Sequence, residues 1–133
     1  MLNNFNTDSA AVFVNGRQIK DWGETDPPFK HSEIDPKRVL RRGIGGNAIA
    51  TARKNPGRRV TLSLNPGGDD ASFLSGLYNS DATINLEYAQ IGTAETAIGA
   101  EGLITSDGES GRGGVSITDA VYTIEFNLWS STK

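Results

Sequence analysis

Hydrophobic and polar residues alternate with a period of two along three stretches of this chain. The apolar members of the three stretches are Val60, Leu62 and Leu64; Ile84, Leu86 and Tyr88; and Tyr122, Ile124, Phe126 and Leu128. Such alternation turns one face of a strand to a core and the other to water, as in antiparallel sheets. The pattern predicts three strands, and weaker patterns predict further strands at 11–14, 18–22, 44–52 and 98–104.

Turn residues set the expected boundaries of these strands. Asn15-Gly16 separates two short apolar runs and predicts a tight hairpin. Asn55-Pro56-Gly57 fits a type II turn, because proline fixes the first central φ and glycine accepts a positive φ. This turn is expected to join a strand at 49–54 to the strand at 58–64. The stretch 106–114 has almost nothing apolar to bury and is expected to be a flexible loop.

One short helix is predicted over residues 69–80. Phe73, Leu74, Leu77 and Tyr78 recur at helical spacing and form one apolar stripe. Asp69 or Asp70 is expected to cap the helix N-terminus, where a carboxylate accepts backbone N–H groups. The predicted core consists of Leu62, Leu64, Phe73, Leu77, Leu86, Tyr88, Ile124 and Phe126.

Residues 23–43 read as irregular. Pro27-Pro28 and Asp35-Pro36 break helices and disfavour central strands, so this segment is expected to be an arm or extended hairpin that projects from the domain. The predicted fold is therefore mainly β, as a single domain over 1–133. Two packed antiparallel sheets form a β-barrel or sandwich, with one flanking short α-helix and the long extended arm.

Charge is unevenly placed along the 133 residues. The formal net charge is −3, yet residues 37–59 carry eight basic residues and no acid, whereas ten acids and two bases follow Val60. A basic cluster can bind nucleic acid, and a nucleic-acid-binding β-barrel stays open as an alternative. A net negative chain is a poor polyanion binder, so a solvated face or a protein contact is favoured.

The residues offer no catalytic chemistry. The chain has no cysteine and one histidine, His31, which argues against thiol chemistry and a histidine metal site and leaves His31 as a surface or contact residue. The glycine-rich segment 43–47 matches no nucleotide-binding spacing. Glu87, Glu101 and Glu125 fall on separate predicted strands, where a solvated strand face is the default over a glycosidase pair. We expect no enzyme, no cofactor, no metal, no signal peptide and no membrane anchor.

The order of these parts carries a family resemblance. A hairpin at 12–16 leads into the charged arm, then come a glycine- and asparagine-containing segment at 43–48, a strand and turn at 60–67, a helix at 73–78 and a last strand at 117–129. From about Val12 to Trp129 this layout resembles the tail tube proteins of tailed bacteriophages, particularly those with contractile tails. The tubes of type VI secretion systems and of phage-tail-like bacteriocins share the same architecture.

The resemblance implies a structural function. Such proteins form hexameric rings that stack into a hollow tube, through which tape-measure protein and then DNA pass without tight binding. It also implies tail sheath and baseplate proteins as partners, and assembly in the host cytoplasm into the tail of a virion. The alternatives are a tube-capping adaptor, either a tail terminator or a baseplate protein, and the tube of a tail-like secretion or bacteriocin particle.

The resemblance also assigns roles to polar residues. An acidic or neutral lumen releases DNA more readily than a basic one, and the residues expected to line it are Asn85, Glu87, Glu101, Glu125 and Asn127. Contacts between rings are expected to pair an acidic arm with a basic hairpin tip. The residues of this predicted contact are Glu24, Asp26, Glu33 and Asp35 on the arm, and Arg53, Lys54, Arg58 and Arg59 on the hairpin.

Overall fold

The computed structural model describes residues 10–133, which form nine strands and one helix. The strands and helix are, in chain order, β1 (Ala10–Val14), β2 (Arg17–Ile19), β3 (Phe29–Glu33), β4 (Arg38–Arg42), β5 (Ala48–Ala52), β6 (Arg58–Leu64), α1 (Asp69–Asn79), β7 (Ile84–Gln90), β8 (Thr96–Asp107) and β9 (Ala120–Thr132). Asn15 and Gly16 both have positive φ and turn β1 into β2, as the sequence predicts.

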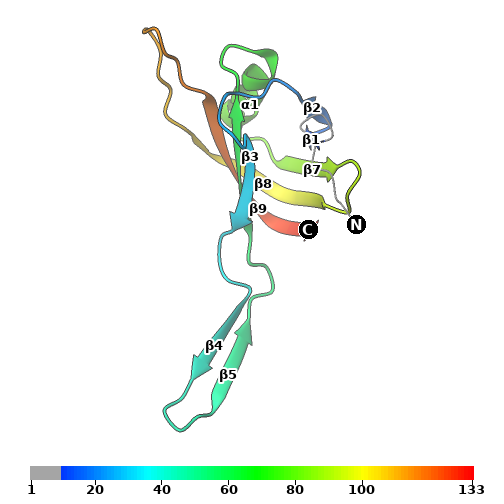
Figure 1. The fold of residues 1–133 in the computed structure, drawn as a ribbon, viewed down its shortest axis with the longest axis vertical. Helices are drawn as coiled ribbons and strands as arrows, with labels where there is room; N and C mark the ends of the chain where they lie inside the picture. The colour runs from blue at the N-terminus through cyan, green and yellow to red at the C-terminus, as the bar shows by residue number, and fades with distance from the viewer. Residues whose placement is uncertain (1–9) are drawn as a thin grey trace.

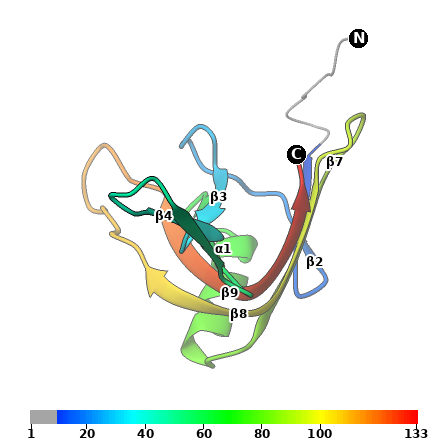
Figure 2. The same cartoon turned by 90° about the horizontal axis from the view of Figure 1, so that it is seen from below.

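Seven strands form one antiparallel sheet in the order β2-β1-β7-β8-β9-β6-β3. The sheet curves strongly, and Figure 2 shows the bend that β8 and β9 make across its middle. A single bridge between Trp22 and Leu64 brings the chain after β2 back to β6. The predicted mainly β fold with two antiparallel sheets and one helix is confirmed. The seven-stranded sheet packs like a sandwich but is not closed into a barrel.

Inside the curve lies one hydrophobic core. Five of the eight predicted core residues are buried, namely Leu62, Leu64, Leu86, Ile124 and Phe126. Phe73, Leu77 and Tyr88 are partly buried and pack against this cluster. On the helix, Leu74 is fully buried and Phe73 is not, so the helix is turned slightly from its predicted phase.

Helix α1 packs against the sheet through Leu74 and Tyr122. The Tyr122 hydroxyl donates a hydrogen bond to the Ala71 carbonyl oxygen at 3.1 Å and lies 2.5 Å from the Ser75 hydroxyl. The prediction of an aspartate cap is wrong. Gly68 occupies the N-cap position with no side-chain hydrogen bond. Asp70 instead points away from the helix to β2, because its carboxylate has stronger partners there.

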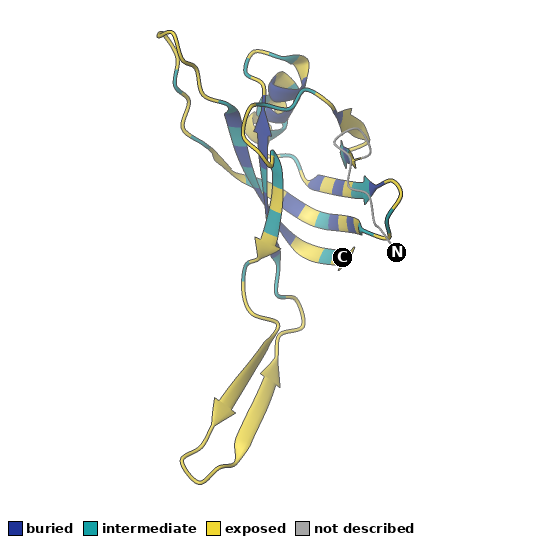
Figure 3. Ribbon diagram, in the orientation of Figure 1, coloured by how far each residue is buried: buried dark blue, intermediate teal, exposed yellow. Residues whose placement is uncertain are grey.

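The projecting arm is a hairpin of β4 and β5, not the segment 23–43. These two strands pair only with each other and extend far from the main sheet (Figure 1). Every residue of both strands is exposed (Figure 3). The first part of the predicted arm contains β3, which pairs with β6 inside the main sheet. Pro27-Pro28 precedes β3 and Pro36 follows it, so the prolines leave the pairing of β3 with β6 intact.

A narrow neck joins the arm to the sheet. The Ile34 amide donates to the Gly57 carbonyl at 3.3 Å, and the Asp35 amide donates to the Pro56 carbonyl at 3.1 Å. Gly57 has the predicted positive φ, 77°. The predicted hairpin between 49–54 and 58–64 is wrong, because β6 pairs with β3 and β9 and β5 pairs with β4.

A second projection lies at the opposite end of the molecule from the arm (Figure 1). It joins β8 to β9 over residues 108–119. The predicted loop at 106–114 therefore begins two residues later, because Ser106 and Asp107 belong to β8. The Thr118 amide donates to the Gly111 carbonyl at 3.2 Å, and the Gly111 amide donates to the Thr118 hydroxyl at 2.7 Å. These bonds tie the two sides of the projection together.

Candidate assembly surface and the root of the arm

The arm presents apolar side chains and basic side chains to solvent. Leu40 is 64% exposed, Ile49 59% and Val39 43%. Alternation along β4 and β5 puts Leu40 between Arg38 and Arg42 on one face, opposite three alanines. A two-stranded hairpin without a core is marginal by itself in water. Within residues 10–133, no other segment covers the apolar side chains of the arm.

The predicted basic hairpin tip does not form. Arg53 and Lys54 lie in the stem of the arm and are exposed. Arg58 begins β6 and is buried, so it does not lie at an exposed hairpin tip. Arg59 points to the other face of the sheet, where it lies 3.7 Å from the Glu125 carboxylate. The four cations are thus distributed over three places because β5 and β6 are not paired.

The predicted acidic residues are also separated. Glu24 and Asp26 are exposed in the loop between β2 and β3. This loop is pinned by Asp119, whose carboxylate accepts the Glu24 amide at 3.0 Å and the Thr25 amide at 2.8 Å. Glu33 ends β3 and lines one pocket with Lys37 and Lys54, whereas Asp35 lies in the neck beside Pro56.

His31 and Arg58 form a compact cluster at the root of the arm. Arg58 donates from Nε at 3.0 Å and from Nη2 at 2.7 Å to Nδ1 of His31, so this nitrogen is unprotonated. The imidazole ring lies 5.2 Å from the Trp129 ring and 5.6 Å from the Phe29 ring. His31 shares the inner face of β3 with Phe29 and is half-buried there, so it is a contact residue, one of the two roles expected of it.

This environment changes the acidity of His31. Burial, followed by repulsion from Arg58 and then from Lys133, lowers its pKa to about 4. Trp129 completes the cluster with its ring 5.7 Å from the Arg58 guanidinium carbon, and its buried Nε1 has no hydrogen-bond acceptor within residues 10–133.

We predict that His31 makes stability pH-dependent between about pH 6.5 and 4. In this window the unfolded chain binds a proton on His31 and the folded chain does not, so the free energy of unfolding falls as the pH falls. The expected loss is about 1–2 kcal/mol after solvent screening. Urea unfolding at pH 7, 5.5 and 4.5 measures it, with His31→Gln as the variant in which the slope is reduced. A midpoint near 6.5 in the NMR titration of this single histidine would contradict the prediction.

The predicted lumen residues lie in two groups on the surface of the sheet. Glu101, Glu125 and Asn127 are neighbours on β8 and β9, and the Asn127 amide donates to Glu101 Oε2 at 3.2 Å. Asn85 and Glu87 lie on β7 and share a shallow pocket with Phe13 on β1. None of these five side chains lies in the core.

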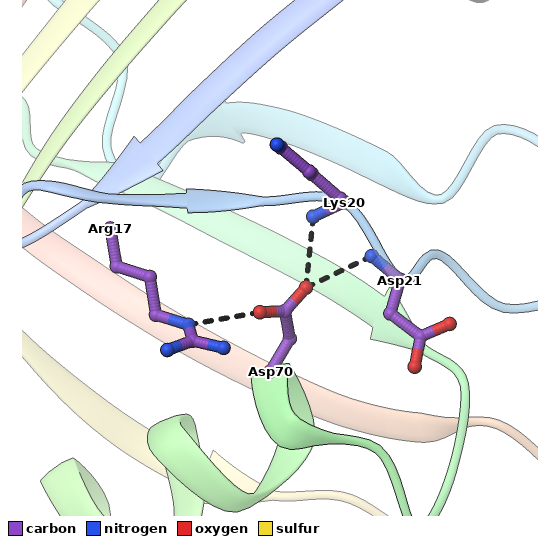
Figure 4. Close-up of polar contacts among 4 residues, drawn as sticks. All are labelled: Arg17, Lys20, Asp21 and Asp70. Carbon is purple, nitrogen blue, oxygen red and sulfur yellow. Dashed lines mark hydrogen bonds and ion pairs between the residues drawn. The ribbon is translucent and has the colours of Figure 1, made fainter.

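Sequence reasoning missed the role of Asp70, which joins the helix to β2 (Figure 4). Its Oδ2 accepts the Lys20 and Asp21 amides, each at 2.9 Å, and its Oδ1 accepts Arg17 Nε at 3.0 Å. Burial alone would raise the pKa of Asp70, but these hydrogen bonds and the Arg17 charge outweigh it and lower the pKa. The sequence did contain a sign that Asp70 faces inward, because residues 70, 74 and 77 share one helix face.

We predict that Asp70→Asn lowers the free energy of unfolding by about 2–3 kcal/mol, because a buried charged acceptor is lost. Asp69→Asn is the matched control, since Asp69 is exposed on the same turn, and it should change stability by less than about 1 kcal/mol. Because the folded pKa of Asp70 is depressed, its contribution is present above about pH 3.8 and is lost on further acidification. Equal losses in the two variants, measured by urea unfolding at pH 7, would show that the Asp70 contacts do not stabilise the fold.

No three His, Asp or Glu side chains within residues 10–133 are grouped so that they could hold a metal ion. Over the same residues, no helix combines the length and apolarity needed to cross a bilayer.

The fold of this chain is similar to that of solved chains from contractile injection systems. The anti-feeding prophage cap, a tube-terminating cap, aligns over 99% of this chain and 93% of its own, with a TM-score of 0.66 and 13% identity. A chain of the sheath–tube complex of an extracellular contractile injection system, PVC, in the extended state aligns over 97% and 91%, with a TM-score of 0.62 and 16% identity.

A third solved structure is the sheath/tube terminator of the same PVC system in the extended state. It aligns over 98% of this chain and 97% of its own, with a TM-score of 0.61 and 14% identity. No protein-family model and no curated protein sequence matches this chain. The likeness is therefore one of fold, and it extends over nearly the whole chain.

Proposed function

We propose that this protein is a structural, ring-forming component of a contractile tail or injection particle, and that it sits at the end of the tube as a terminator or cap. The observation that carries the proposal is the arm, whose exposed apolar and basic residues have no partner surface within residues 10–133. In a ring, the arm lies on the neighbouring copy. The cap position is supported by the two terminator structures that share the fold.

The distribution of charge supports another copy of this chain as the partner of the arm. The arm and its stem are purely basic from residue 37 to 59, whereas the net charge of the whole chain is −3. Opposite charge on another copy steers assembly and fixes its register. Each exposed pair contributes only ~0–1 kcal/mol, so the apolar side chains of the arm supply the affinity and several pairs repeated around a ring supply the direction.

A second candidate is the main tube subunit, and the similarity to a chain of a sheath–tube complex favours it. Under both candidates the proposal includes hexameric rings, contacts with sheath and baseplate proteins, and a role without catalysis. The residues proposed to line the lumen are Asn85, Glu87, Glu101, Glu125 and Asn127.

The contact proposed between rings pairs acidic residues with the two cations of the stem, namely Glu24, Asp26, Glu33 and Asp35 with Arg53 and Lys54. Arg58 is left out of this contact because it is buried, and Arg59 because it already pairs with Glu125.

Negative-stain electron microscopy of the purified protein tests the proposal. A cap should form single or paired rings that stop growing, because its outer face is not made to receive another ring. A main tube subunit should form long tubes under the same conditions. A protein that stays monomeric at high concentration, with its arm intact, would contradict both candidates.

A further inference from the structure

The neck of the arm and the end of β9 enclose a pocket of about 440 Å³, which we call the arm-root pocket. Its walls include Lys37 and Lys54 from the stem, Arg58 from β6, and Asn127 and Trp129 from β9. The pocket is polar, and it does not include the residues proposed for the lumen other than Asn127.

The charge of this pocket is unbalanced. Three cations line it, and Glu33 is the one carboxylate among its lining residues. Arg58 is 9% exposed, and it donates its side-chain hydrogen bonds to the neutral His31 imidazole. The ion pairs formed within residues 10–133 use Arg17 and Arg59. A buried cation normally has an anionic partner, because removing its water costs several kcal/mol.

The end of β9 adds neutral donors to the same pocket. Strand β6 pairs with β9 only from Ala120 to Phe126, whereas β9 continues to Thr132. Beyond Phe126 the edge of β9 that faces β6 therefore has no strand partner within residues 10–133. Such an edge presents unpaired backbone N–H groups. Asn127, Ser130 and Ser131 lie in the same wall.

We propose that the arm-root pocket binds a carboxylate. The hydrogen bonds to His31 use Nε and Nη2 of Arg58 and leave Nη1 for a ligand. A carboxylate matches a guanidinium in shape and charge, and its second oxygen can accept from a lysine or from the β9 edge. The carboxylate comes either from an acidic side chain of a neighbouring copy or from a small free acid. The pocket itself does not depend on the proposed function.

Acetate binding to the unassembled subunit tests the pocket. Trp22→Phe leaves Trp129 as the one tryptophan of the chain, and its ring lies beside Arg58. Sodium acetate replaces sodium chloride at constant ionic strength while Trp129 fluorescence is recorded. We expect a saturable change. A change that stays linear with acetate, or no change at all, overturns the proposal.

Variants of the lining residues test whether acetate binds in the arm-root pocket. Arg58→Met should weaken acetate binding by at least ~10-fold, the loss expected of one charge-assisted hydrogen bond. Because the buried Arg58 variant can fail to fold, Lys54→Met provides a second test on the rim, with an expected loss of ~2- to 5-fold. Arg53→Met is the matched control, since Arg53 is an exposed stem residue outside the pocket wall. Equal losses in Lys54→Met and Arg53→Met overturn the assignment.

Assembled particles distinguish the two sources of the carboxylate. If a neighbouring copy supplies it, the pocket is already filled after assembly, and acetate changes the fluorescence of the dissociated subunit only. Acetate should then also slow assembly more than chloride at equal ionic strength. A fluorescence change of the same size in both forms assigns the pocket to a small free acid. Failure of the protein to assemble would count against the proposed function and leave the acetate result on the subunit standing.

Discussion

Replacing Phe126 by alanine is expected to lower the free energy of unfolding by about 3–5 kcal/mol. The side chain is 1% exposed, and its ring lies 5.6 Å from the Trp129 ring. Gly102 on β8 leaves room for this ring, since a Cβ at that position would lie 2.5 Å from two of its carbons. Removing the ring leaves a cavity that the rigid strands β6 and β8 cannot fill. The loss is a large part of the ~5–15 kcal/mol that holds a domain of this kind together.

Leu128→Ala is the matched control for Phe126→Ala. Leu128 lies two residues further along β9 and is 42% exposed, so its truncation should cost less than about 1 kcal/mol. Urea unfolding at pH 7 measures both variants. A loss below about 1 kcal/mol for Phe126→Ala would mean that the ring does not lie in the core and that the inner face of β9 is assigned to the wrong side.

Replacing the arm, residues 38–52, by a short glycine–serine linker is expected to abolish ring formation and leave the subunit folded. Strands β4 and β5 pair only with each other, and all their residues are exposed, so the core loses nothing. The thermal midpoint should stay within a few degrees of the parent, the shift expected for less than about 1 kcal/mol. Sedimentation of the shortened protein should give a monomer at concentrations where the parent forms rings.

A point variant separates the surface of the arm from its length. Leu40→Asp replaces the most exposed large apolar side chain of the two arm strands by a negative charge and should prevent assembly as the deletion does. Ala50→Ser, opposite Leu40 in the hairpin, is the conservative control and should assemble like the parent. Rings formed by the shortened protein, or a shortened protein that is unfolded, would show that the arm is not the assembly element.

Period-two alternation predicted the strands at 60–64, 84–88 and 122–128 because each has one buried and one solvated face. Strand β3 was missed because its five residues lie between Pro27-Pro28 and Pro36. Its own alternation, with Phe29 and His31 inward and Lys30 and Ser32 outward, was visible in the sequence. Once β3 takes its place beside β6, the arm has to begin further along the chain.

The buried polar residues were the harder part to predict. The inner positions of β6 include Val60, Leu62 and Leu64, and the same parity puts Arg58 inside. The residue type predicts an exposed Arg58 instead, because arginine is seldom buried without a carboxylate. The pairing with His31 and Trp129 joins three strands that are distant in sequence, and no local pattern contains it. The arm-root pocket therefore follows from the topology of the sheet and not from a motif.

Gold labelling of tagged protein in intact contractile particles can show where the protein lies. We expect one cluster of label per particle, at the end of the tube, because a terminator closes the tube once. Label along the whole tube would contradict the cap position and assign the chain to the main tube, and particles without label would contradict its place in the assembly altogether.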